Sequence, residues 1–238
     1  MTYARKQMIL PLVVAAIATR SAWAADSVVE LRTQIRAAIL ASRPAIPVAM
    51  NRIEALAETG EYRLLGLKSP SESHTIHLDS PLPVFEIYLD ELTRYDPERT
   101  KLVPMIHPVG EVTYLVMRPD GSVASKAVVA KSEGRWQAAS LGSVIQSMRI
   151  FESLPHSVSP PATEEPARFL LEVSALHVVF IGTLVENSGS AVPDGESQIL
   201  LKVVSSGIPE IGEGQSGSAA DFFRTMKRVA QTTPDLPV

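Results

Sequence analysis

The chain has 238 residues, of which 45% are hydrophobic and 5% aromatic, with a formal net charge of −4 and no cysteine. The lack of cysteine excludes disulfides, thiol catalysis, iron–sulfur clusters and cysteine-ligated zinc. Basic residues are scattered, with no run longer than Lys227-Arg228. Because phosphates require clustered Lys and Arg, this pattern argues against a nucleic-acid partner.

Residues 1–24 have the features of a signal peptide. Arg5 and Lys6 form a positively charged start, Met8–Ala18 is apolar, and Ala22-Trp23-Ala24 fits a signal-peptidase site. The apolar stretch is shorter than the about 20 residues that span a bilayer. We therefore expect cleavage, no stable membrane insertion afterwards, and a mature chain of residues 25–238 in the periplasm or outside the cell. If cleavage fails, the same stretch would hold the chain at the membrane surface.

The mature chain has 19 basic and 26 acidic side chains, a formal charge of −7. Its first elements are predicted to be helices over 27–42 and 48–59. Asp26 is the expected N-cap of the first helix, and Arg43-Pro44 its end. Residues 62–67 are expected to be extended.

From residue 74 the pattern favours strands. Phe85, Ile87 and Leu89 alternate with polar residues, as in a half-buried strand, although a helix through Phe85 and Leu92 is an alternative. A meander is predicted over 112–140, with turns at 118–121 and 132–134. A helix then covers 143–154, with a capping box from Ser143 to Gln146. Its expected buried stripe is Val144, Met148 and Phe151.

The proline-rich segment 155–166 has the composition of a linker or surface loop. Strands are predicted over 168–173, 176–185 and 198–204, and a helix over 219–231 with Ser218 as its cap. The fold class is thus α+β: an antiparallel or mixed sheet packed by an N-terminal helical layer and two further helices. We expect a single domain over 25–238, and the order of its elements suggests two similar halves, each a strand meander followed by a helix. Two lobes joined at 155–166 are the alternative.

The segment from Gly212 to Gly217 has the spacing G-x-G-x-x-G before a helix. A phosphate could bind at the start of that helix, around Gly214 and Ser216. However, no strand end precedes the glycines and no second βα unit follows, so a flexible loop is the simpler interpretation and no nucleotide cofactor is expected. Ser216 also lacks the setting of a nucleophile elbow.

Few other residues suggest chemistry. On a strand, His74 and His77 point to opposite faces, so no metal site is predicted. His177 lies in an apolar run and is expected to be buried, either as a hydrogen-bonded core residue or as part of a site on the sheet. Trp136 is expected either to pack beneath a helix or to contact a protein partner. His107 is placed in a loop without a role, and Asp90-Glu91 in a turn.

No catalytic, cofactor or metal set emerges, so an enzyme is less favoured than a binding protein. We expect an exported soluble protein that binds or scaffolds another envelope protein, through a sheet edge or the loops 155–166 and 206–217. Trp136, His177, Gly214 and Ser216 are the candidate interaction residues. An exported hydrolase with a dispersed site, or a small-molecule carrier, is the alternative. Oligomeric state does not follow from the sequence.

Overall fold

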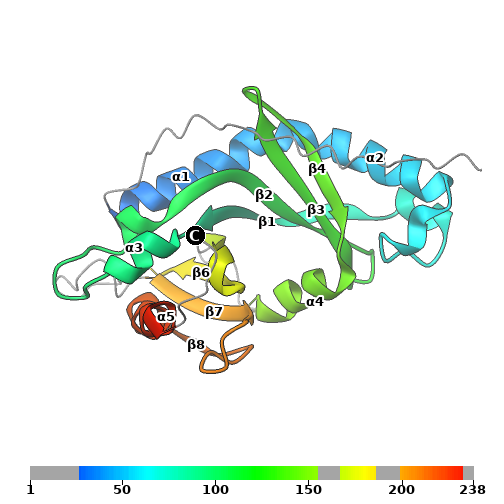
Figure 1. Cartoon of the computed structure of the whole chain (residues 1–238). Helices are drawn as coiled ribbons and strands as arrows, with labels where there is room; N and C mark the ends of the chain where they lie inside the picture. The colour runs from blue at the N-terminus through cyan, green and yellow to red at the C-terminus, as the bar shows by residue number, and fades with distance from the viewer. Residues whose placement is uncertain (1–26, 155–166, 186–198, 233–238) are drawn as a thin grey trace, which may run out of the picture.

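The computed structural model describes residues 27–154, 167–185 and 199–232 (Figure 1). The predicted signal peptide, the expected cap Asp26 and the proline-rich segment 155–166 lie outside these ranges. Within them, no helix is long and apolar enough to cross a membrane.

Two helices, α1 (Val28–Ser42) and α2 (Ile46–Glu58), form the N-terminal layer. Ser27 caps α1, since its Oγ accepts a hydrogen bond from the Glu30 amide at 3.3 Å. The proline at position 44 ends α1 as predicted, but it does so within one 3₁₀ turn, Arg43–Ala45, that leads straight into α2. The two helices therefore follow each other along one side of the sheet (Figure 1).

The described strands form one mixed sheet in the order β4-β3-β2-β1-β5-β6-β7-β8. The central strands β1 and β5 are parallel, and every other neighbouring pair is antiparallel. β1 and β5 each begin a four-stranded meander that ends in a helix, α4 or α5. The strand bounds are β1 (His77–Glu86), β2 (His107–Met117), β3 (Val123–Ser132), β4 (Arg135–Gly142), β5 (Arg168–Val173), β6 (Val178–Leu184), β7 (Ile199–Ser205) and β8 (Ser216–Ser218).

The two faces of the sheet carry different helices. On one face, α1, the short helix α3 (Leu89–Arg94) and α5 (Ala219–Thr232) surround a core that includes Phe85 and Phe169, whose rings meet edge to face at 5.3 Å. On the other, α4 (Val144–Ser153) packs on a smaller apolar cluster, and we call this the α4 face. The predicted α+β class, with its helical layer, mixed sheet and two further helices, is confirmed, and α3 is added to it.

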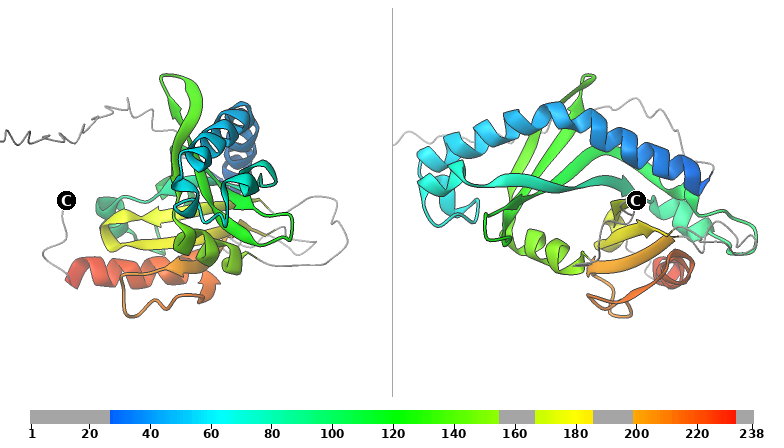
Figure 2. Two further views of the ribbon diagram at one scale, coloured as in Figure 1. Left: turned by 90° about the vertical axis from the view of Figure 1, so that its right-hand side faces the viewer. Right: turned by 180° about the vertical axis from the view of Figure 1, so that it is seen from behind.

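The sheet is strongly bent. Four of its seven described strand pairings contain register shifts, and such irregularities bend and twist strands. The α4 face is concave around the middle of the sheet, as the view from behind shows (Figure 2). Side chains on different strands of that face therefore converge.

The segment between α2 and β1 is compact, so the extended conformation predicted for 62–67 is wrong. Arg118, at the end of β2, holds this segment against the sheet: its guanidinium donates to Glu72 Oε1 at 2.8 Å and to the Gly66 carbonyl. Gly66 has a φ of 70°, and a Cβ there would lie 2.2 Å from the backbone oxygen of Ala124. A glycine is therefore required at this close approach.

The buried stripe predicted for α4 is wrong in part: Phe151 does pack on the apolar cluster beneath the helix, but Met148 does not. Met148 is 46% exposed, whereas the small residues Ser147 and Ser153 are buried with Ile150. Ser143 precedes the helix with a φ of 64°, so its hydroxyl caps no backbone amide and the predicted capping box does not form. Which side chains of α4 are buried therefore depends on how the helix packs on the sheet, and not only on which of its residues are apolar. In contrast, the cap predicted for α5 is confirmed by a hydrogen bond from the Asp221 amide to Ser218 Oγ.

Candidate functional site

The α4 face carries four charged side chains next to the apolar patch that α4 covers. Glu86 in β1 lies directly opposite Glu172 in β5. Glu111 in β2 and Lys126 in β3 complete the group. All four residues are half-buried. We refer to these residues as the Glu–Lys cluster.

Strand alternation places the cluster on this face. Glu172 is two residues from Leu170, and Lys126 is the cross-strand partner of Leu115. Both leucines are buried in the apolar cluster beneath α4. Glu111 lies four residues before Leu115 on β2, and residues an even number apart on a strand share a face. Glu86 shares the face of its partner Glu172.

Burial controls the ionisation of this cluster. It raises the pKa of Glu172, against the charge of Lys126 and with the help of the Glu111 and Glu86 carboxylates. Burial also raises the pKa of Glu111, again opposed by Lys126. The pKa of Lys126 is lowered by burial, although Glu172 and Glu111 favour its charged form. Desolvation therefore outweighs attraction at three of the four groups.

The coupling of Lys126 to Glu172 depends on the curvature of the sheet. Two strands, β2 and β1, separate β3 from β5. Neighbouring strands lie about 4.8 Å apart, so three such spacings would keep the two Cα atoms far apart in a flat sheet. The sheet is instead concave, as Figure 2 shows, and the charges of Lys126 and Glu172 influence each other's pKa.

The cluster does not stabilise the fold through direct contacts. Among the described residues, none of its four side chains has an ion pair or hydrogen bond. Like charges directly opposite each other on neighbouring strands, as in Glu86 and Glu172, are destabilising. Titratable groups with shifted pKa values in a concave surface, retained at a cost to stability, are typical of functional sites. We therefore take the Glu–Lys cluster as the candidate site.

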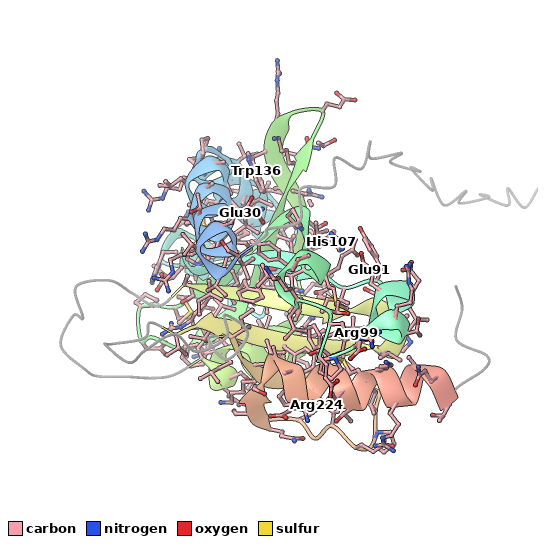
Figure 3. The ribbon with its side chains drawn as sticks, turned by 90° about the vertical axis from the view of Figure 1, so that its left-hand side faces the viewer. Glu30, Glu91, Arg99, His107, Trp136 and Arg224 are labelled. Carbon is pink, nitrogen blue, oxygen red and sulfur yellow. The ribbon has the colours of Figure 1, made fainter. Side chains whose placement is uncertain are left out.

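A histidine–carboxylate pair extends this face. His107 lies opposite Glu86 at the start of β2, and its Nε2 is 2.7 Å from Glu91 Oε2 at the start of α3. The Tyr88 ring stacks on the imidazole with a centroid distance of 4.8 Å. The side chains of His107 and Glu91 are only 13% and 29% exposed, and they lie side by side in Figure 3. His107 therefore begins a strand rather than lying in the predicted loop, and Glu91 lies in a short helix rather than in the predicted turn.

This pair supplies two parts of a hydrolytic triad, a base and the carboxylate that orients it. The third part would be a hydroxyl on the other imidazole nitrogen. In the described ranges, His107 has no such partner. The pair can hold a proton or orient a ligand, and it lacks a nucleophile among the residues that the structure places.

Trp136 lies away from the Glu–Lys cluster. It is half-buried in the edge strand β4 and packs on the small apolar cluster of Ala45, Ala49, Val112, Tyr114 and Val129 beneath the N-terminal helices. Its position near those helices is visible in Figure 3. The structural interpretation, a side chain packed beneath a helix, is the one that these contacts favour.

The expectation that His177 is buried is wrong. The predicted strand 176–185 begins only at Val178, and His177 is exposed in the turn between β5 and β6 with a φ of 52°. Its carbonyl accepts a hydrogen bond from the Gly207 amide at 3.0 Å. Histidine is one of the residues that tolerate left-handed backbone, which explains its place in a tight hairpin.

The loop around Gly214 and Ser216 does not form a phosphate cradle. The Gly214 amide donates to the Val203 carbonyl at 2.9 Å, and Ser216 belongs to β8, opposite Lys202. At the start of α5, Asp221 adds a carboxylate where an anion would sit. Gly214 does line a pocket of about 240 Å³ whose other members include Arg149, Glu152, Lys202 and Glu213. The amides that a phosphate needs are already engaged.

No metal centre is apparent in the described ranges, where no group of three His, Asp or Glu residues could hold an ion. His74 precedes β1 and lies 3.7 Å from Glu54, and His77 opens β1. Comparison with protein-family models, curated proteins and solved structures finds no significant match. The candidate site is therefore defined by its geometry alone.

Sequence reasoning missed every member of the candidate site. The signal was present: Lys126 and Glu172 are lone charges within apolar strands, in VASKAVVA and FLLEV. A single charge at an inward position of a strand is unusual, because burying it is costly. What the pattern could not show is that bending the sheet brings these separate charges onto one surface.

Proposed function

We propose that this is an exported protein that acts by binding another protein of the bacterial envelope, with the face that carries the Glu–Lys cluster as its binding surface. The observation that carries the proposal is the cluster itself, whose charges are half-buried and have no direct partner among the described residues. A partner that supplies opposite charges would offset the free-energy cost of half-burying these unpaired charges. The signal-peptide features of residues 1–24 support export.

The other surfaces considered from the sequence have less support. On the free edge of β4, the Ala138 carbonyl is already occupied by Arg52 Nη1 at 3.1 Å. At the far edge, β8 covers part of β7. The loop 206–217 is tied to β7 through the Gly214 amide, and 155–166 lies outside the described residues. A partly occupied edge and a very short edge strand disfavour the addition of a strand from a partner.

The test uses the mature chain, tagged and returned to the exported fraction of its host. The variant Glu86→Gln/Glu172→Gln removes two cluster charges with little change in volume, and Glu58→Gln/Glu61→Gln removes two exposed charges as a control. We expect a defined partner with the wild type and the control, released by salt, and its loss with the cluster variant. Equal recovery with both variants would contradict the proposed surface.

A hydrolase remains the second candidate function, favoured by the contact of 2.7 Å between His107 and Glu91. It predicts hydrolysis of an ester or amide substrate that is abolished by His107→Ala while the protein remains folded. The binding proposal predicts no such turnover. The two functions are therefore separated by an activity screen on wild type and His107→Ala.

A further inference from the structure

Lys126 differs from the other lysines on its sheet in its surroundings. It lies in the middle of β3, between Leu115 on β2 and Gly142 on β4. Leu115 is fully buried and Gly142 has no side chain, so the lysine stem has an apolar neighbour on one side and no neighbouring side chain on the other. The helix α4 packs against β3, the strand that carries Lys126, and the lysine is half-buried.

The amine of Lys126 is also unengaged. Lys202 Nζ donates to the Glu152 carbonyl at 3.3 Å and Lys227 Nζ donates to the Tyr95 carbonyl. In the part of the chain that the structure describes, Lys126 Nζ makes no hydrogen bond or ion pair. In its neutral form, an amine that makes no hydrogen bond within the fold keeps its lone pair available to a ligand.

We propose that Lys126 is a covalent capture site for small aldehydes and ketones, which it binds reversibly as a Schiff base. The Nζ lone pair attacks the carbonyl carbon, and the carbonyl π electrons move to oxygen to give a carbinolamine. The two protons of the neutral amine then leave with that oxygen as water, and a carbon–nitrogen double bond remains. No oxidant, reductant or further reactant is consumed.

The electrostatics of the site support this reactivity. Only the neutral amine attacks a carbonyl, and burial lowers the pKa of Lys126 and so enlarges its neutral fraction. Glu172 and Glu111 act in the opposite direction, because each favours the ammonium. Removing the Glu172 carboxylate should therefore make Lys126 more reactive.

The experiment traps the adduct in the intact mature protein. Acetaldehyde is added at pH 7 with sodium cyanoborohydride, which reduces the imine to a stable amine, and labelled lysines are located by peptide mass spectrometry. Lys131, exposed five residues further along the same strand, is the internal control. We expect Lys126 to be labelled at least about threefold faster than Lys131, with the ratio falling as the pH approaches that at which both amines are neutral.

Two variants complete the test. Glu172→Gln should raise the labelling rate of Lys126 about twofold or more at pH 7, since it removes a charge that favours the ammonium. Lys126→Met should abolish labelling at this position and leave Lys131 unchanged. Equal rates at the two lysines, or slower labelling of Lys126 in Glu172→Gln, would overturn the proposal. The inference does not depend on the protein-binding function, and either can fail without the other.

Discussion

Replacing Glu172 by glutamine should stabilise the protein at neutral pH. The substitution keeps the shape of the side chain and removes the like charge opposite Glu86 on β1. Such cross-strand repulsion costs about 0.2–1 kcal/mol. The loss of attraction to Lys126 offsets part of the gain, but burial outweighs that attraction in the shift of the Glu172 pKa. We expect a net increase of less than about 1 kcal/mol in the free energy of unfolding.

The gain should depend on pH in a defined direction. The pKa of Glu172 in the folded protein is raised above its ordinary value of 4.5, so the folded state binds its proton more tightly than the unfolded state does. This contribution to stability is complete below the unfolded pKa and is lost as the pH rises through the folded pKa. Glutamine does not titrate. The difference between variant and wild type is therefore near zero at pH 4 and reaches its maximum above the folded pKa.

Urea unfolding of the mature chain at pH 4, 5, 6, 7 and 8 measures this difference. At pH 8 the variant should also melt higher than wild type, by less than about 4 °C, given about 2–4 °C per kcal/mol for a chain of this length. Glu61→Gln, at an exposed position, is the control and should show no such pH trend. A Glu172→Gln variant that is less stable than wild type at pH 8, or equally shifted at every pH, would refute the reasoning.

Three further substitutions test the structural framework, each by urea unfolding. Gly66→Ala should lower the free energy of unfolding by about 3 kcal/mol or more, because the added Cβ would lie 2.2 Å from a backbone oxygen. Gly60 also has a positive φ, of 95°, but open space around it, so Gly60→Ala should cost only about 1 kcal/mol. Similar costs at the two sites would contradict the close approach. Arg118→Lys keeps the charge but loses the guanidinium group, which donates hydrogen bonds to three segments. We expect a cost of about 1.5–3 kcal/mol in the free energy of unfolding. No change in stability would show that these hydrogen bonds do not hold the segment before β1 in place. Tyr114→Phe should cost about 1 kcal/mol through its buried 2.7 Å hydrogen bond to Ser42 Oγ, and the double variant with Ser42→Ala should be less destabilised than the sum of the single variants.

Local pattern was sufficient where a segment's structure depends on its own residues. The meander over 112–140 and the capped helix α5 were both predictable, because turn chemistry and a Ser-to-Asp cap act over a few residues. The alternation at Phe85 and Ile87 was ambiguous, and both interpretations apply in part: the strand ends at Glu86 and α3 begins at Leu89.

The sequence pattern gave wrong predictions where contacts with residues distant in sequence determine which side chains are buried. The buried side of α4 is set by how closely it approaches β3 and β7, so small serines are buried there and Met148 is not. His177 has apolar neighbours in sequence, but it occupies a turn that requires left-handed backbone. Apolar composition predicts burial only if the chain continues straight through the segment.

The sequence by itself determined the α+β class, most of the strands and the acidic, cysteine-free character of the chain, since these follow from composition and local periodicity. Only the tertiary structure decided that Glu86, Glu111, Lys126 and Glu172 share one concave surface. Each of these charges lies on a different strand, and their meeting depends on strand order, on the pairing of β1 with β5 and on the register shifts that bend the sheet. Those features arise from contacts between distant segments, which local residue preferences do not encode.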